Sequence, residues 1–215
     1  MATWPVVLRE PIPSGLVRLR PLNRGDERAW HRLRSSNYHW LRPWEATTPG
    51  NTKRPVDFRA FITLLDKQGK SGSQLPWAVE YNGELAGQIT VAAISYGALH
   101  SATIGYWVSQ ALAGRGITPT AVALATDYCF WALGLHRMEI NICTNNGPSL
   151  RVVEKLGFRD EGLRVKYLHI NGQWEDHRAF AILSEDVPGG LLTRWRNIQA
   201  DQLQNDDSQC KTLRN

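Results

Sequence analysis

The chain has 215 residues, of which 42% are hydrophobic and 21% charged; these are ordinary values for one soluble globular domain with a single core. It has no run of about 20 apolar residues and begins without the apolar core of a secretory signal, so we expect a cytoplasmic protein with no membrane partner. Its net charge of +5 is diffuse and accompanies no recognised nucleic-acid motif, so no direct nucleic-acid role is expected.

The three cysteines, Cys129, Cys143 and Cys210, are odd in number and lack a Cys-x-x-Cys spacing. That pattern argues against a disulfide framework and against a zinc site, and no His, Asp or Glu spacing suggests another metal. Cys129 lies in an apolar segment, and we expect it in the core.

The first half of the chain predicts one strand and two helices. Residues 16–22 alternate apolar and basic side chains, which is typical of a half-exposed strand. Residues 26–34 place Trp30 and Leu33 at helical spacing, and residues 54–68 put several apolar side chains on one helical face.

A hairpin is expected next, because residues 75–80 and 85–95 flank a turn with Asn82-Gly83, the strongest short hairpin signal. A further strand is expected over 101–108. The chain thus supplies several antiparallel strands before its glycine-bearing loop.

The stretch from Ile104 to Phe158 carries the most information. A strand ends at Val108, and the loop Gly114-Arg115-Gly116 opens into a long apolar helix. Glycines let a backbone approach a phosphate closely, and the free amides at a helix start favour an anion. This order of elements suits a phosphate-bearing cofactor.

After this loop the pattern predicts a strand over 137–144 and a helix beginning near Asn146. Two strands, 163–170 and 174–183, flank a second Asn-Gly turn. The C-terminal part has helix potential over 191–198 and then becomes a polar tail.

Residues 113–118 resemble the pyrophosphate loop Gln/Arg-x-x-Gly-x-Gly/Ala of the GNAT superfamily of N-acetyltransferases, with Gly116 matched strictly and Ala113 and Thr118 departing from the pattern. Asn146 and Ser149 match the superfamily's Asn-x-x-Ser motif. More narrowly, the stretch resembles the ribosomal-protein-alanine N-acetyltransferases of the RimJ/RimL type. Further matches are Glu154-Lys155-Leu156-Gly157-Phe158, His39-Trp40-Leu41 with Pro43-Trp44, and Gly172-Gln173-Trp174 with Asp176-His177.

The resemblance implies a single α/β domain with a mixed, mostly antiparallel sheet, flanking helices and two splayed central strands. It covers roughly residues 15–183 and leaves 1–14 as an N-terminal extension and 184–215 as a C-terminal helix with a polar tail. The implied activity is transfer of an acetyl group from acetyl-CoA to an amine.

The resemblance also assigns the cofactor site. Loop amides would hold the pyrophosphate, and the first splayed strand would bond the pantetheine arm. Asn146 would contact that arm, or act as a turn or helix-capping residue. Ser149 would protonate the leaving thiolate, or cap its helix, or both. The cofactor-binding residues expected are Trp107, Val108, Gly114, Arg115, Gly116, Ile117, Thr118, Asn146 and Ser149.

Glu139 is the candidate base for the amine proton. It alternates with Met138 and Ile140 along the second splayed strand, so it shares one face with Asn141, a candidate substrate contact. The alternative is a surface glutamate paired with Arg137.

Trp40, Trp44 and Glu45 lie in the segment that resembles the family's substrate loop. An acidic group beside aromatic rings suits a cationic N-terminal amine. The alternative is that the tryptophans close the core beneath helix ends.

The sequence therefore predicts an acetyl-CoA-dependent N-acetyltransferase acting on a protein N-terminal α-amine, with a ribosomal protein as the candidate partner and a monomer or homodimer as the assembly. An acetyltransferase for a small amine, such as an antibiotic or polyamine, and a non-catalytic acyl-CoA-binding module both stay open.

Overall fold

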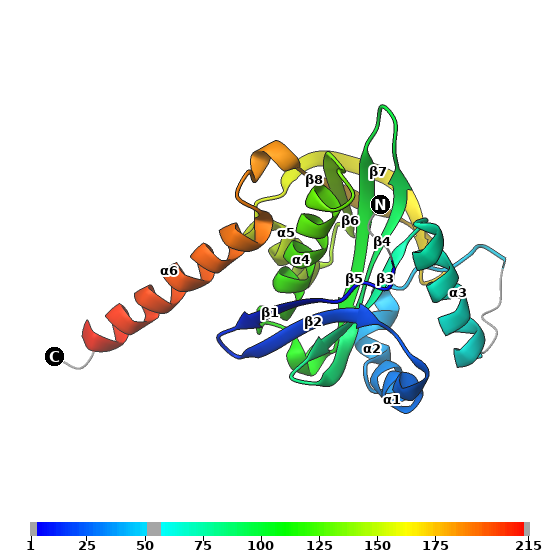
Figure 1. Ribbon diagram of the computed structural model, residues 1–215, viewed down its shortest axis with the longest axis horizontal. Helices are drawn as coiled ribbons and strands as arrows, with labels where there is room; N and C mark the ends of the chain where they lie inside the picture. The colour runs from blue at the N-terminus through cyan, green and yellow to red at the C-terminus, as the bar shows by residue number, and fades with distance from the viewer. Residues whose placement is uncertain (1–3, 51–56, 213–215) are drawn as a thin grey trace.

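The computed structural model describes residues 4–50 and 57–212, and its centre is one eight-stranded sheet in the order β1-β2-β3-β4-β5-β6-β8-β7 (Figure 1). Neighbouring strands are antiparallel except β5 and β6. The strands are β1 (Leu8–Ile12), β2 (Gly15–Pro21), β3 (Leu75–Tyr81), β4 (Glu84–Ser95), β5 (Ser101–Val108), β6 (Arg137–Cys143), β7 (Arg159–Ile170) and β8 (Gln173–Leu183).

Helices lie on both sides of the sheet (Figure 1). They are α1 (Glu27–Ser36), α2 (Tyr38–Leu41), α3 (Phe58–Ser71), α4 (Ile117–Trp131), α5 (Gly147–Leu156) and α6 (Leu191–Thr212), with short 3-10 turns at Arg24–Asp26, Arg42–Trp44, Gln110–Leu112 and Ser184–Asp186. Within the described ranges, no helix combines the length and the apolar character that a bilayer crossing requires.

The core consists of two apolar clusters separated by the sheet. Along β3, Trp77 and Val79 face the larger cluster with α4, α5 and the start of α6, whereas Ala78 faces a smaller cluster with α1 and α3. α4 is buried around most of its circumference, as expected of a helix that is apolar on all sides. Cys129 is fully buried in it, which confirms the prediction from its apolar surroundings.

The two central strands separate after a short paired stretch. β5 and β6 run parallel, and their register contains only Ser101–Arg137, Ala102–Met138 and Thr103–Glu139. Beyond Thr103, β5 continues to pair with β4, and β6 pairs with β8 along its whole length. The predicted α/β sheet with splayed central strands is therefore confirmed.

Local turn signals explain the two hairpins that were predicted from Asn-Gly turns. Asn82 and Gly83 have φ values of 50° and 87°, and Asn171 and Gly172 have 46° and 92°. Positive φ at both central residues is the requirement of a tight type I′ turn, and Asn-Gly meets it with little strain.

The two ends of the chain depart from the predicted layout. The segment 8–12, assigned to an N-terminal extension, pairs with β2 as an edge strand. The C-terminal helix, predicted over 191–198, continues to Thr212, and its sequence after Gly190 contains no glycine or proline to end it. Residues 54–56 of the predicted second helix lie outside the described residues, and α3 begins at Phe58 after the cap Asp57.

Candidate active site

The glycine-bearing loop forms the start of α4. Gly116 is the N-cap residue with φ 80°, no side chain caps the helix there, and Gly114 has φ 83°. Both glycines adopt the left-handed conformation, which a side chain would strain. The amides of Ile117 and Thr118 begin the helix and have no intrahelical partner, so they are donors for an anion.

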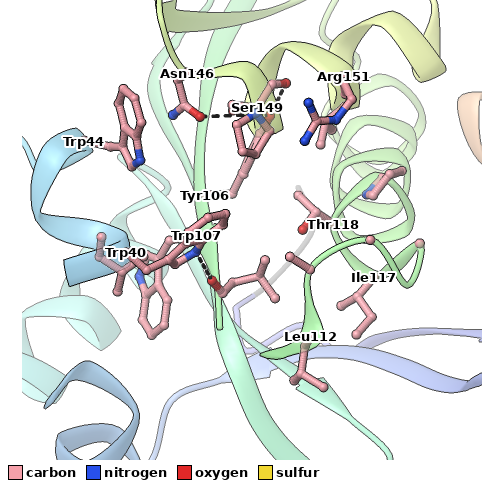
Figure 2. A pocket seen from close by; sticks show the side chains of 18 of the residues that line it. Trp40, Trp44, Tyr106, Trp107, Leu112, Ile117, Thr118, Asn146, Ser149 and Arg151 are labelled. Atoms are coloured by element: carbon pink, nitrogen blue, oxygen red, sulfur yellow. Dashed lines mark hydrogen bonds between the residues drawn. The ribbon is translucent and has the colours of Figure 1, made fainter. Parts of the chain in front are cut away.

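A cavity of about 360 Å³ opens where β5 and β6 separate (Figure 2). We call one part of its wall the helix side; it comes from the glycine-bearing loop, the start of α4 and α5. We call the other part the tryptophan side; it comprises Arg34, Trp40, Trp44 and Glu45. The helix side contains Ala113, Gly114, Gly116, Ile117, Thr118, Pro119, Asn146, Pro148, Ser149, Arg151, Val152 and Lys155.

Ser149 lies in the first turn of α5 and points to Tyr106 of β5 across the cavity wall (Figure 2). Its hydroxyl donates to the Tyr106 hydroxyl oxygen at 2.8 Å, and the Tyr106 hydroxyl donates to the Ser149 carbonyl at 3.4 Å. Burial raises the pKa of Tyr106, so this phenol stays protonated at neutral pH. The Asn146 side chain accepts the Ser149 amide at 3.2 Å, so Asn146 is an N-cap and also lines the cavity.

The end of β5 supports the tryptophan side. The Trp40 indole donates to the Val108 carbonyl at 3.1 Å, so that carbonyl, predicted to be free for the cofactor, already has a donor. Asn37, which is 5% exposed, accepts bonds from the Ser109 hydroxyl and the Gln110 amide. These bonds fix α2 against β5 and so set the position of Trp40.

Glu45 is paired with a basic residue. Its carboxylate accepts a short bond from the Arg34 guanidinium, which also lies 5.3 Å from the ring centre of Trp107. Trp107, Trp40, Trp44 and Glu45 all line the cavity, so the structure brings together the residues predicted for the substrate loop.

Glu139 and Asn141 lie apart from this group. Glu139 occupies the last paired position of β6, at the closed end of the gap, and accepts bonds from Arg137 at 2.7 Å and Arg164 at 3.1 Å. Neither residue belongs to the cavity lining within the described chain. The Asn141 side-chain oxygen is buried without a hydrogen-bond partner among the described residues.

Some lining residues had no role in the sequence prediction. Arg34, Tyr106, Arg151 and Lys155 reach the cavity from α1, β5 and α5. The four-residue spacing of Arg151 and Lys155 places both on one side of α5, a pattern visible in the sequence. Arg115, predicted to bind the cofactor, is exposed and lies outside the lining of the described cavity.

The cavity fits a coenzyme A thioester. Uncapped amides at the start of α4, together with Arg151 and Lys155, supply the positive potential that phosphates require. The gap between β5 and β6 offers an apolar channel past Tyr106 and Trp107 for a narrow arm. In the described part of the chain no group of His, Cys, Asp and Glu side chains could hold a metal ion.

Comparison with known proteins agrees with this geometry. The family model "Acetyltransferase (GNAT) domain" matches residues 17–159. A probable N-acetyltransferase YjcK of Bacillus subtilis is 46% identical over 47% of this chain, and the match spans 56% of that relative. The [ribosomal protein uS5]-alanine N-acetyltransferase of Escherichia coli is 28% identical over 72% of this chain and 81% of its own.

A spermidine N(1)-acetyltransferase of Escherichia coli is 30% identical over 74% of this chain and 82% of its own. Among solved structures, Mycobacterium smegmatis RimJ in complex with CoA-disulfide has a TM-score of 0.82 at 37% identity, covering 89% of this chain and 93% of that one. Fold, cavity and relatives agree, and the chain belongs to the GNAT family of acetyl-CoA-dependent N-acetyltransferases.

Proposed function

We propose that the enzyme acetylates the N-terminal α-amine of a protein, with a ribosomal protein beginning in alanine as the model acceptor. Relatives named for that activity and relatives named for acetylation of spermidine are similarly distant from this chain. The choice between the two acceptor classes therefore depends on the charge of the tryptophan side.

The Arg34–Glu45 pair is the observation that carries the proposal. Among the described residues, the cavity lining contains one acidic side chain, Glu45, and three basic ones, Arg34, Arg151 and Lys155. A multiply charged polyamine needs a surplus of carboxylates for electrostatic complementarity, whereas the described lining has a surplus of basic side chains and its carboxylate is paired with Arg34. A peptide N-terminus with a single amine fits this surface better, and aromatic rings suit its one positive charge.

In the proposed reaction the acceptor amine enters from the tryptophan side, and acetyl-CoA supplies the activated acetyl group as a thioester. The amides at 114–118 hold the pyrophosphate, with Arg151 and Lys155 facing the phosphates. Asn146 holds the first turn of α5 and thereby aims Ser149 into the cavity.

Removal of the proton from the acceptor amine needs little help from the protein. A free α-amine has a pKa of about 7.7 to 8.0 and is partly neutral at pH 7, so water suffices to take its proton. The Ser149 hydroxyl turns from Tyr106 to the leaving sulfur, whose thiol pKa is near 8.5, and donates its proton there, while water returns a proton to the Ser149 oxygen. Glu139, held by Arg137 and Arg164, has no step in this scheme.

The test measures release of CoA from acetyl-CoA with a panel of acceptors. The panel contains peptides with varied N-terminal residues, the same peptides with a blocked α-amine, free lysine, polyamines and aminoglycosides. We expect release with peptides beginning in Ala or Ser, and none after the α-amine is blocked.

Release with polyamines or aminoglycosides alone would move the assignment to a small-amine acetyltransferase. The Arg34→Ala variant sharpens the choice. The substitution removes one positive charge beside the Glu45 carboxylate, so we expect polyamine turnover to rise relative to peptide turnover. An unchanged ratio would show that this ion pair does not set acceptor choice.

A further inference from the structure

A buried hydrogen-bond chain links the C-terminal helix to the glycine loop. The Trp195 indole of α6 donates to the Thr120 hydroxyl at 2.9 Å, and that hydroxyl donates to the Gly116 carbonyl at 2.8 Å. Thr120 is 0% exposed and Trp195 is 2% exposed, so water does not compete for these bonds. Gly116 is the N-cap of α4, where the uncapped amides begin.

A second contact from α6 reaches the same glycine. A Cβ added at Gly116 would lie 3.0 Å from the Gln199 side-chain nitrogen and 3.6 Å from the Trp195 ring. The helix therefore packs directly against the loop, and neither Trp195 nor Gln199 belongs to the lining of the described cavity. α6 also lies outside the segment matched by the family model, which ends at residue 159.

The base of α6 is fixed independently of the loop. Asp127 of α4 accepts the Leu191 and Leu192 amides at 2.7 and 3.0 Å, and Glu10 of β1 accepts two bonds from Arg196, both 2.6 Å. Figure 1 shows the first turns of α6 against α4 and the rest extending away from the body. Trp195 is thus presented to Thr120 from a rigid base.

We propose that Trp195 and Thr120 are positioning residues that hold the Gly116 peptide so that the loop amides face the pyrophosphate of acetyl-CoA. This inference rests on the proposed role of the loop 114–118. Preorganised amides bind an anion without first losing conformational freedom, so loosening the Gly116 carbonyl should weaken binding of the phosphate-bearing part of the cofactor only.

The experiment compares the dissociation constants of CoA and S-acetylpantetheine, which lacks the pyrophosphate, measured by calorimetry. Thr120→Val removes the hydroxyl at nearly constant volume, and Trp195→Phe removes the donor. We expect CoA binding to weaken about fivefold, the size of one net hydrogen bond, with S-acetylpantetheine binding unchanged. The loss should be smaller in Trp195→Phe, which leaves the bond from the Thr120 hydroxyl to the Gly116 carbonyl in place.

Two control variants distinguish the positioning role from an unspecific effect of a Thr→Val change in α4 and from a failure of the loop assignment. Thr126→Val makes the same change in the same helix, but the Thr126 hydroxyl is buried without a partner among the described residues, so CoA binding should not change. Arg115→Glu places a negative charge in the exposed loop and tests the loop's role itself.

The outcomes are distinct. If Arg115→Glu weakens CoA binding but Thr120→Val and Trp195→Phe do not, the positioning role is overturned and the loop assignment stands. Equal weakening of both ligands in the two variants would indicate a general structural defect and overturn it too. If Arg115→Glu leaves CoA affinity unchanged, the loop assignment fails, and this inference fails with it.

Discussion

The Ser149 hydroxyl is held by Tyr106, a neighbour that the sequence pattern could not supply. Asn-x-x-Ser predicted the position of Ser149 on the first turn of a helix, because Asn is a helix-capping residue and the spacing is local. Tyr106 lies 43 positions earlier, on β5, and only the folded sheet brings the two hydroxyls to 2.8 Å. The position of Glu139 relative to the cavity also depends on the folded sheet, because it is set by the residue at which β5 and β6 separate.

Replacing Ser149 with Ala should lower kcat by about 100-fold with a change below threefold in the KM for acetyl-CoA, because a positioned proton donor acts in the transition state. Steady-state rates at saturating acceptor measure this. Glu139→Gln is the contrast variant, and its kcat should stay within threefold because its carboxylate is held outside the cavity. A larger loss in Glu139→Gln, with loss of the acidic limb of the pH–rate profile, would make Glu139 the base.

Asp26 gives stability a pH dependence. Burial raises the pKa of Asp26, but bonds from Arg20 and the Asn23 amide outweigh it, so the net pKa lies below its ordinary value. The carboxylate therefore stabilises the fold above the unfolded pKa of about 4, and this contribution is lost as pH falls through the folded pKa.

Asp26→Asn should lower the free energy of unfolding by about 2–3 kcal/mol at pH 7, because it leaves the partly buried Arg20 with a weaker partner. The difference from the parent protein should shrink as pH falls below about 4. Urea denaturation at pH 7, 5 and 3 measures it, with the exposed Glu84→Gln as control. A difference that stays constant across this range would refute the assignment.

At the scale of elements, α6 depends on a cap supplied by another helix. Asp127 lies in α4, 64 residues before the first amide that it accepts, so no local signal marks it as a capping residue. Burial raises the pKa of Asp127, and the two amide bonds lower it, with the net shift upward. The carboxylate is nevertheless the acceptor that keeps the start of α6 on the body.

Asp127→Ala should destabilise the protein by about 1–2 kcal/mol through loss of this cap, which corresponds to a fall in Tm of roughly 2–8 °C for a chain of this size. Differential scanning calorimetry measures it. The matched control is Asp201→Ala, a change at an exposed position of α6. Equal Tm values for the two variants would contradict the capping role.

Most elements were predictable because their signals are local. The Asn-Gly turns required positive φ values that the structure contains, and α3 and α5 are capped by Asp57 and Asn146, the residues just before them. The edge strand β1 was not predicted, because its identity comes from pairing with β2 and from the Arg196–Glu10 contact with the far end of the chain. Distant pairings of this kind leave no periodic trace in the sequence.

At the scale of the molecule, cofactor binding should raise stability in proportion to saturation. With CoA at about 100 times its dissociation constant, linkage predicts a gain of roughly 2.7 kcal/mol, or about 5–10 °C in Tm. Thermal scans over a CoA concentration series measure this. S-acetylpantetheine at the same molar concentration should give a smaller gain, and an equal gain would exclude the phosphates as the main source of affinity.

The parting of β5 and β6 has a mechanical consequence. Within the sheet, strands β1 to β5 are joined to strands β6 to β8 only by the three residue pairs at the beginning of β5 and β6. Beyond these pairs, β5 and β6 separate. A cofactor arm bound between β5 and β6, as proposed, would connect the two parts of the sheet. With CoA bound, thermal unfolding should therefore have a higher midpoint and a narrower transition. The reason is that the two parts of the sheet then unfold as one cooperative unit instead of two weakly coupled ones.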